Sequence, residues 1–233
     1  NSRSIKELFL FLFRKNNVNH ADLFKNAKLA LFTEESYSQI KKAINSDSLL
    51  VKNKNVQKLI KQELFLLILQ KSLIVDKLLE KLITRIRKEI LFILINNKHN
   101  IIKQYFDFIA SIAEQCFLNE YIFNKSKKEN EQVKQLERKI INNKKINELE
   151  IAILGCYVPL NNSKNLVEKI LNYKSNNILF NDLVNIQIRQ PLEEIKLANS
   201  IKSFDKIVDN ISKKVREQYE ENPYPRWRHT YKN

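Results

Sequence analysis

Apolar residues recur along most of the chain at the three- and four-residue spacing that places them on one face of an α-helix. The first such segment runs from about Ser4 to Lys15, and a second, short one continues to Leu31. Thr33 precedes two acids and is suited to cap a third helix, because acidic side chains stabilise the positive end of the helix dipole. Residues 45–55 are mostly polar and predict a connection.

Stronger helical patterns fill the middle of the chain. A stripe over residues 56–68 predicts one helix, and Asp76 is placed to cap another that extends to Leu94. Over residues 101–124 apolar side chains occupy nearly two sides of a helix. We therefore expect this segment to lie at the centre of the core.

The next segments differ sharply in polarity. Residues 125–145 are highly charged, with an apolar seam of Val133, Leu136 and Ile140, and predict a solvated helix that packs along one edge. Residues 151–160 (IAILGCYVPL) are the one stretch that could form a strand. No partner strand is visible elsewhere, so we favour a buried helix that ends near Tyr157.

Three further helices are predicted over residues 166–173, 178–188 and 205–221, with Pro191 at a helix start and Pro223 after the last helix. The last one places a set of apolar residues on one face: Phe204, Ile207, Val208, Ile211, Val215 and Tyr219. The fold class expected is all-α, an irregular multi-helix bundle or array of about nine to eleven helices. An extended proline-rich strap follows at the C-terminus. We divide the chain into an N-terminal helical segment over 1–52, a helical accessory domain over 53–212, and a helix end with the strap over 213–233.

Glycine is almost absent, since Gly155 is the single glycine among 233 residues. A chain of this length would ordinarily hold roughly sixteen. Glycine supplies the positive-φ turns and the close backbone approach of phosphate-binding loops. The composition therefore excludes dinucleotide loops, Walker loops and nucleophile elbows from this chain, and we expect neither a catalytic residue nor a cofactor site of its own.

The formal net charge of +15 allows binding to polyanions. The excess is spread along the chain, and isoleucine, asparagine and lysine are all abundant, which is typical of AT-rich coding DNA. Nucleic acid is therefore a less favoured partner. No apolar run approaches the ~18–20 residues of a membrane span, and no signal peptide is evident, so we expect a cytoplasmic protein.

The two cysteines, Cys116 and Cys156, are forty residues apart in apolar surroundings, and the three histidines are widely separated. This pattern predicts buried, reduced thiols and no metal site.

The C-terminal residues 215–227 (VREQYEENPYPRW) form an unusual pattern. Pro223 and Pro225 fix two φ angles and bias the residues before them to extended geometry, which predicts a stiff strap. The strap carries Tyr224, Arg226, Trp227 and Arg228, which could grip a ligand or pin the strap to a neighbouring helix.

The string QYEENPYPRW (218–227) resembles the lead-in to the catalytic domain of bacterial class I S-adenosylmethionine-dependent methyltransferases, a group often described with tetratricopeptide repeats. Shorter stretches resemble the same group in the same order, over about residues 55–229. They are Asp76 with LLEKLITRIR, AEQCFLNEYIF (113–123), CYVPL (156–160) and RQPLEE (189–194), the last departing from the group's pattern at Gln190.

In that family the glycine-rich Rossmann domain follows the PYPRW segment. The resemblance therefore implies a helical accessory region that recruits substrate or forms a lid, with S-adenosylmethionine bound by a downstream domain and a protein as the expected substrate. It implies that Tyr219, Tyr224, Arg226 and Trp227 border the pocket of that domain. The docking candidates are Asn222, Pro223, Pro225, Arg228, Asn119 and Glu120. Alternatives are a stand-alone helical protein-interaction domain and a basic nucleic-acid-binding domain.

Overall fold

A computed structural model describes residues 2–96, 99–200 and 210–221. These residues form helices and no strand, which confirms the predicted all-α array. The helices are α1 (Ser2–Arg14), α2 (His20–Leu31), α3 (Glu34–Ile44), α4 (Lys54–Ile60), α5 (Glu63–Lys71), α6 (Lys77–Ile95), α7 (His99–Lys103), α8 (Phe106–Leu118), α9 (Lys127–Asn142), α10 (Glu148–Gly155), α11 (Lys164–Leu171), α12 (Ile178–Val184), α13 (Gln190–Ser200) and α14 (Asn210–Glu221). A 3-10 turn, η1 (Leu50–Lys52), and a π-helical turn, η2 (Asn185–Arg189), complete the described structure.

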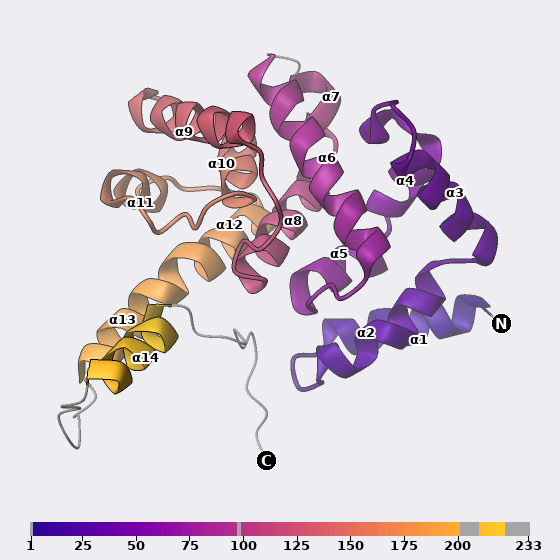
Figure 1. Ribbon diagram of the computed structural model, residues 1–233, viewed down its shortest axis with the longest axis horizontal. Helices are drawn as coiled ribbons and strands as arrows, with labels where there is room; N and C mark the ends of the chain where they lie inside the picture. Colours follow the sequence, from indigo (N-terminus) through magenta and orange to yellow (C-terminus); the bar gives the residue numbers. More distant parts are fainter. Residues whose placement is uncertain (1, 97–98, 201–209, 222–233) are drawn as a thin grey trace.

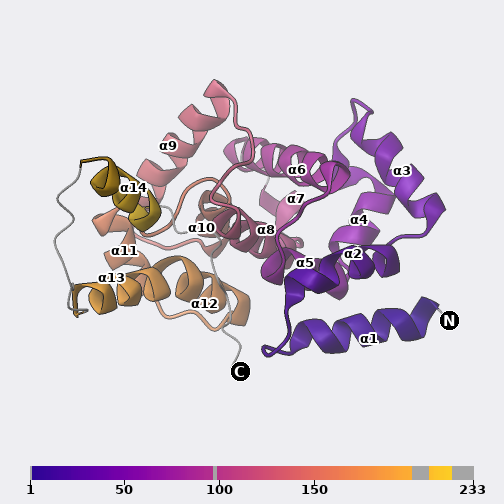
Figure 2. The ribbon, with the colours of Figure 1, turned by 60° about the horizontal axis from the view of Figure 1, so that its bottom comes forward.

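The helices follow one another along an elongated array (Figures 1 and 2), from α1–α3 at one end to α13 and α14 at the other. Helix α8 lies in the middle and packs against α5, α10 and α12. Every residue from Phe108 to Leu118 is buried, including the polar Ser111, Glu114 and Gln115. The prediction of a central helix in this region is confirmed.

Side-chain caps begin seven of the fourteen described α-helices. Thr33 accepts a hydrogen bond from the backbone N–H of Ser36 at 3.1 Å, and Asp76 accepts from those of Leu78 and Leu79 at 3.1 and 3.0 Å. Both predicted caps are therefore present. Asparagine side chains cap four more helices: α2 by Asn19, α4 by Asn53, α10 by Asn147 and α12 by Asn177.

The array holds more helices than the sequence suggested, because two predicted helices are interrupted. The segment over 56–68 is divided into α4 and α5 at Lys61 and Gln62, and the segment over 101–124 into α7 and α8 near Tyr105. Neither break has a glycine or proline to mark it.

The two contrasting segments of the second half form as predicted. Helix α9 buries Val133, Leu136 and Ile140, while most of its other side chains lie at the surface. Residues 151–155 are helical rather than extended, and α10 is buried from Leu149 to Gly155. The helix ends at Gly155, two residues before the expected position.

Two local expectations need correction. The connection over 45–55 is not simply polar, because the side chains of Leu50 and Val51 are almost completely buried and pack in the hydrophobic core. Pro191 lies in the first turn of α13, as predicted, but this helix is not separate, since α12, η2 and α13 follow without a break. A proline ring clashes with the carbonyl group four residues earlier, and the wider π turn before Pro191 relieves that clash.

The predicted apolar face of the last helix is only partly described. Ile211 and Val215 of α14 are exposed, so this part of the face does not pack against the described core. Phe204, Ile207 and Val208 lie outside the described residues, as does the side chain of Tyr219.

One hydrophobic core runs through the array, from Phe9 in α1 to Ile188 in η2. The division into segments 1–52, 53–212 and 213–233 stays a prediction. Within the described residues, none of the helices combines the length and apolar character needed to cross a lipid bilayer.

Candidate functional site

Of the predicted pocket and docking residues, only Asn119 and Glu120 have described side chains. Tyr219 lies in α14, where the structure describes its backbone but not its side chain. The other seven also lie outside them: Asn222, Pro223, Tyr224, Pro225, Arg226, Trp227 and Arg228. The structure therefore describes the candidate residues at the end of α8, whereas those of the strap lie outside the described residues.

Asn119 and Glu120 do not lie within the buried helix but directly after its C-terminus. Glu120 and Tyr121 both adopt left-handed backbone conformations, with φ of 55° and 57°. A non-glycine residue in this region is strained and persists only where surrounding contacts hold it. Here the backbone N–H of Tyr121 donates to the carbonyl oxygen of Cys116 at 2.8 Å, so the strained turn closes back onto α8.

Gln187, in the π-helical turn, holds this strained turn through hydrogen bonds of its side chain. Its side-chain Nε2 donates to the carbonyl oxygens of Ala113 at 2.8 Å and of Gly155 at 3.2 Å. Its Oε1 accepts from the hydroxyl of Tyr121 at 3.2 Å and from the backbone N–H of Leu160 at 3.3 Å. One buried carboxamide thus joins α8, α10, the strained turn and the segment after α10.

The single glycine of the chain lies under this carboxamide. A Cβ atom on Gly155 would come within 3.3 Å of Oε1 of Gln187 and 3.4 Å of the Cβ of Ala113. The backbone of Gly155 has no positive φ. The glycine therefore serves close packing between α10, α8 and Gln187 rather than an unusual turn.

Arg87 forms a second buried centre on α6. Its Nη1 donates to the carbonyl oxygen of Cys156 at 3.2 Å, and its Nη2 to those of Phe123 and Asn124 at 3.3 and 2.8 Å. The guanidinium lies 4.4 Å from the ring centroid of Tyr157. No carboxylate of the described residues pairs with it, and its Nε has no hydrogen-bond partner there. Carbonyl dipoles and aromatic faces therefore stabilise this buried cation.

The two thiols lie beside this arginine. Cys116 and Cys156 are both buried and free, as predicted. Burial raises the pKa of the Cys116 thiol to about 11, and it raises that of Cys156 well above its ordinary value. The thiolate is the reactive form of cysteine, so neither residue is activated for nucleophilic chemistry near neutral pH.

An open groove of 930 Å³ lies beside the strained turn. One wall comes from α6 and the end of α3, and the other from the turn over 119–126. Asn119 lines the groove, and its Oδ1 is buried without a hydrogen-bond partner among the described residues. The rest of the lining is Ile44, Asn45, Ile74, Glu80, Lys81, Thr84, Arg85, Lys88, Ile122, Phe123, Asn124, Lys125, Ser126 and Glu129.

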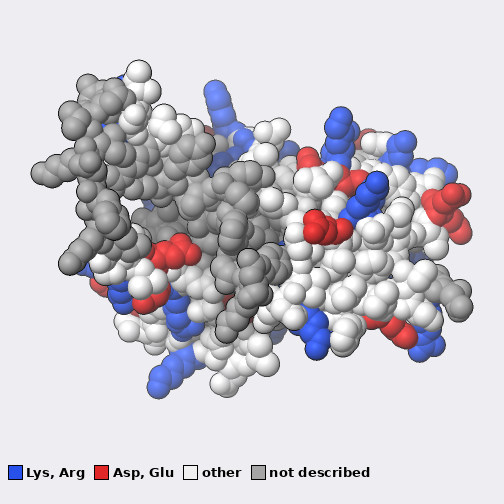
Figure 3. Space-filling view, turned by 90° about the horizontal axis from the view of Figure 1, so that it is seen from below, with Lys and Arg blue, Asp and Glu red and all other residues white. Residues whose placement is uncertain are grey.

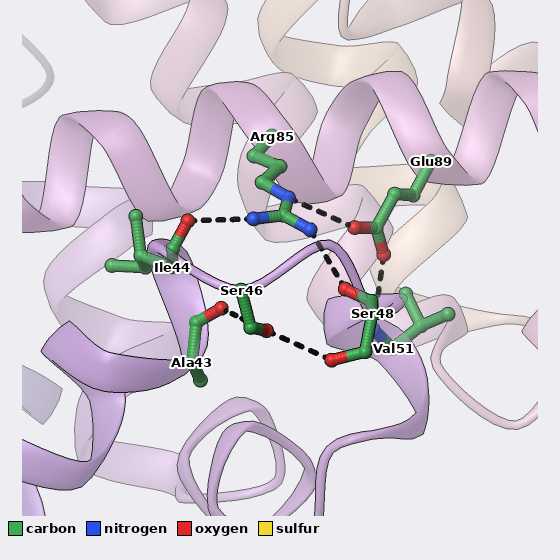
Figure 4. A network of polar contacts seen from close by, with 7 residues as sticks. All are labelled: Ala43, Ile44, Ser46, Ser48, Val51, Arg85 and Glu89. Carbon is green, nitrogen blue, oxygen red and sulfur yellow. Dashed lines mark hydrogen bonds and ion pairs between the residues drawn. The ribbon is translucent and has the colours of Figure 1, made fainter.

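Arg85 fixes the first wall (Figure 4). Its Nη1 donates to the carbonyl oxygen of Ile44 at 2.6 Å and its Nη2 to that of Ser48 at 2.7 Å. Its Nε lies 3.3 Å from Oε1 of Glu89, and Oε2 of Glu89 accepts from the backbone N–H of Val51 at 3.1 Å. The segment after α3 is thereby tied to α6 at two points.

Glu129 supports the opposite wall. Its carboxylate accepts from the backbone N–H and the hydroxyl of Ser126 at 2.9 and 2.8 Å, which completes the capping box of α9. It also accepts from the hydroxyl of Tyr157 at 3.1 Å. Burial, above all, raises the pKa of Tyr157. Its hydroxyl therefore stays protonated and remains a donor to this carboxylate.

The residues of this site can bind a ligand. Among the described residues, no three His, Cys, Asp or Glu side chains are grouped as metal ligands. The groove offers lysine ammonium groups, amides and apolar surface, which can recognise a ligand. Sequence analysis missed Arg87 and Gln187, the two residues that organise the site. The signal was a polar residue at a position where the helical pattern calls for an apolar one.

Comparison of the chain with models of known protein families, with curated proteins and with solved structures found no match.

Proposed function

We propose that this chain is a helical accessory region that works with an S-adenosylmethionine-dependent methyltransferase domain, where it presents a substrate or covers the active site. It has no catalytic role by itself. The resemblance of residues 218–227 to the lead-in of such a domain is the starting point.

The observation that supports the proposal best is spatial. Three of the stretches that carry the resemblance meet at Arg87, which ends the first of them. It contacts Cys116 and Phe123 of the second stretch and Cys156 and Tyr157 of the third. The fourth begins at Arg189, the last residue of the π-helical turn that holds Gln187. Matches that arose separately by chance would have no reason to share one buried cluster.

The scarcity of glycine is consistent with a non-catalytic role. A class I methyltransferase cradles its cofactor on a glycine-rich turn after a strand, and the one glycine here is buried in a helix crossing. We therefore expect S-adenosylmethionine to bind the partner domain and not this chain.

The coding sequence beyond Asn233 provides the first test. The proposal expects a strand and a glycine-rich turn encoded there. A stop codon directly after Asn233 would argue strongly against it. Isothermal titration of this chain with S-adenosylmethionine should give no binding heat, whereas the extended protein should bind. Tight cofactor binding by the present chain would contradict the proposal.

Trp227, the single tryptophan, allows a second test. We expect its fluorescence emission to shift when the catalytic domain is added as a separate chain, and Trp227→Phe to abolish the signal. Unchanged emission, together with no co-elution in gel filtration, would favour a free-standing interaction domain.

A further inference from the structure

We propose that the groove between α6 and the 119–126 turn binds an acidic segment of a partner protein that also carries apolar side chains. The groove would bind such a segment whether or not the chain works with a methyltransferase domain. The argument rests on the charge of the rim, the apolar surface at its centre and the rigidity of its walls.

The charge of the groove is positive, because its lining holds four basic and two acidic residues. Lys81 and Lys88 lie two helical turns apart on α6, are exposed, and form no ion pair with any described residue. Lys125 lies on the other wall and donates to the carbonyl oxygen of Tyr157 at 3.3 Å. Three ammonium groups are therefore available to carboxylates.

The two acidic residues of the lining offset only part of this charge. Glu129 is buried and already accepts hydrogen bonds from Ser126 and Tyr157. Glu80, in the first turn of α6, is the other acidic residue of the lining. Arg85 is paired with Glu89, so the lysines set the rim potential.

Apolar surface accompanies the charge. The floor of the groove includes three apolar side chains that are each less than a tenth exposed: Ile44, Ile74 and Phe123. Ile122 projects from the strained turn with 74% of its surface exposed. An exposed aliphatic side chain between ammonium groups suits a segment in which carboxylates alternate with leucine or isoleucine.

The walls are preformed. Arg85 ties the segment after α3 to α6, and Arg87 ties the turn at Phe123 and Asn124 to the same helix. Two arginines of one helix thus hold both walls, so little ordering is required when a ligand binds.

Nucleic acid fits this surface less well. On the face shown in Figure 3, basic side chains are scattered and interspersed with acidic ones rather than gathered in a continuous stripe. The one aromatic ring in the groove lining, Phe123, is 8% exposed and offers no stacking platform. The arginine in the lining uses its terminal nitrogens on backbone carbonyls.

The test uses fluorescence anisotropy with the full chain at about 50 mM salt, where surface charges are only partly screened. The probes are three labelled synthetic peptide pools of about fifteen residues, a length that spans such a groove. One pool mixes Asp and Glu with Leu and Ile, the second replaces Leu and Ile with Ser, and the third replaces Asp and Glu with Lys. A single-stranded oligouridine serves as the fourth probe.

We expect the acidic-apolar pool to bind most tightly. Lys81→Glu with Lys88→Glu should weaken that binding about tenfold or more, because two attractive contacts become repulsive. Ile122→Ser should weaken it separately. The matched control is Lys134→Glu with Arg138→Glu, two exposed basic residues of α9 outside the groove, which carries the same charge change. It should alter the affinity less than about twofold.

Three results would overturn the proposal: equal losses in the two double variants, no preference for the acidic-apolar pool, or tighter binding of oligouridine that requires Lys81 and Lys88. Thermal unfolding of each variant separates lost binding from lost folding, and both double variants should unfold near the wild-type temperature because all four side chains are exposed.

Discussion

Two arginines of α6, only two residues apart, show how environment sets the importance of the same side chain. Arg85 lies at the surface edge, where Glu89 balances its charge and solvent reaches it. Arg87 is 2% exposed and relies on three carbonyl oxygens and two aromatic rings. Both join distant segments to α6. Because a buried carbonyl that loses its donor cannot turn to water, we expect the buried network to contribute more to stability than the surface one.

Replacement of Arg87 should have the largest effect. Arg87→Met removes the donors to Cys156, Phe123 and Asn124, and should lower the free energy of unfolding by about 3–5 kcal/mol. Arg87→Lys keeps the charge but cannot reach all of these carbonyl groups, so it should be intermediate. Urea unfolding followed by circular dichroism measures both. A loss below about 1 kcal/mol for Arg87→Met would show that apolar packing can replace the buried cation.

The Gln187 network should rank second. Gln187→Leu removes one buried donor to the carbonyl groups of Ala113 and Gly155 and the acceptor of Tyr121 and Leu160, and should cost about 2–3 kcal/mol. Gly155→Ala would gain about 1 kcal/mol in an exposed helix. Here it should instead destabilise by about 1–2 kcal/mol, because the added methyl group meets Gln187.

A double-mutant cycle identifies the source of that cost. In a Gln187→Ala background the methyl group of Gly155→Ala has room, so most of its penalty should disappear. An unchanged penalty would assign the conflict to Ala113 instead, whose Cβ lies at 3.4 Å.

The features of the fold that could be predicted from the sequence are those with local signals, whereas features that depend on distant contacts could not be predicted. Helices with a clear apolar stripe and a polar cap, such as the one that begins after Asp76, could be predicted because both signals are local. The end of α8 could not, since its strained residues Glu120 and Tyr121 are not glycines and carry no turn signal. Arg87 and Gln187 were missed because their partners come from segments distant in sequence.

The candidate site was predictable only in part. Asn119 could be predicted because it belongs to the stretch over 113–123, and it does line the groove. The groove itself depends on the contacts of Arg85 with Ile44 and Ser48, some forty residues away. Spacing along one helix gives no information about such contacts.

Arg85 provides the direct counterpart to Arg87. Arg85→Ala should lower the free energy of unfolding by about 1–2 kcal/mol, because water can replace part of the lost donor set at this half-buried position. Glu89→Gln should cost less, since an amide oxygen can still accept from the backbone N–H of Val51. Urea unfolding at matched pH compares these variants. A loss for Arg85→Ala equal to that of Arg87→Met would remove the distinction between the two networks.

The ion pair between Lys28 and Asp76 should have the smallest effect and one that depends on pH. Burial of the Asp76 carboxyl acts to raise its pKa, but the hydrogen bond and charge of Lys28, with the backbone N–H groups of Leu79 and Leu78, outweigh burial and lower the pKa below 3.8. A carboxyl with a lowered pKa in the folded state stabilises the protein above its unfolded pKa and loses that contribution as the pH falls through the folded value.

Asp76→Asn keeps a side-chain oxygen for the helix cap but loses the ion pair, so it should cost at most about 1 kcal/mol at pH 7. The difference in unfolding free energy between wild type and variant should shrink as the pH falls below about 4, because the wild-type carboxyl becomes protonated. Lys28→Met should show the same loss at neutral pH. A difference between wild type and Asp76→Asn that stays constant from pH 7 to pH 2 would assign the effect to the cap geometry rather than to charge.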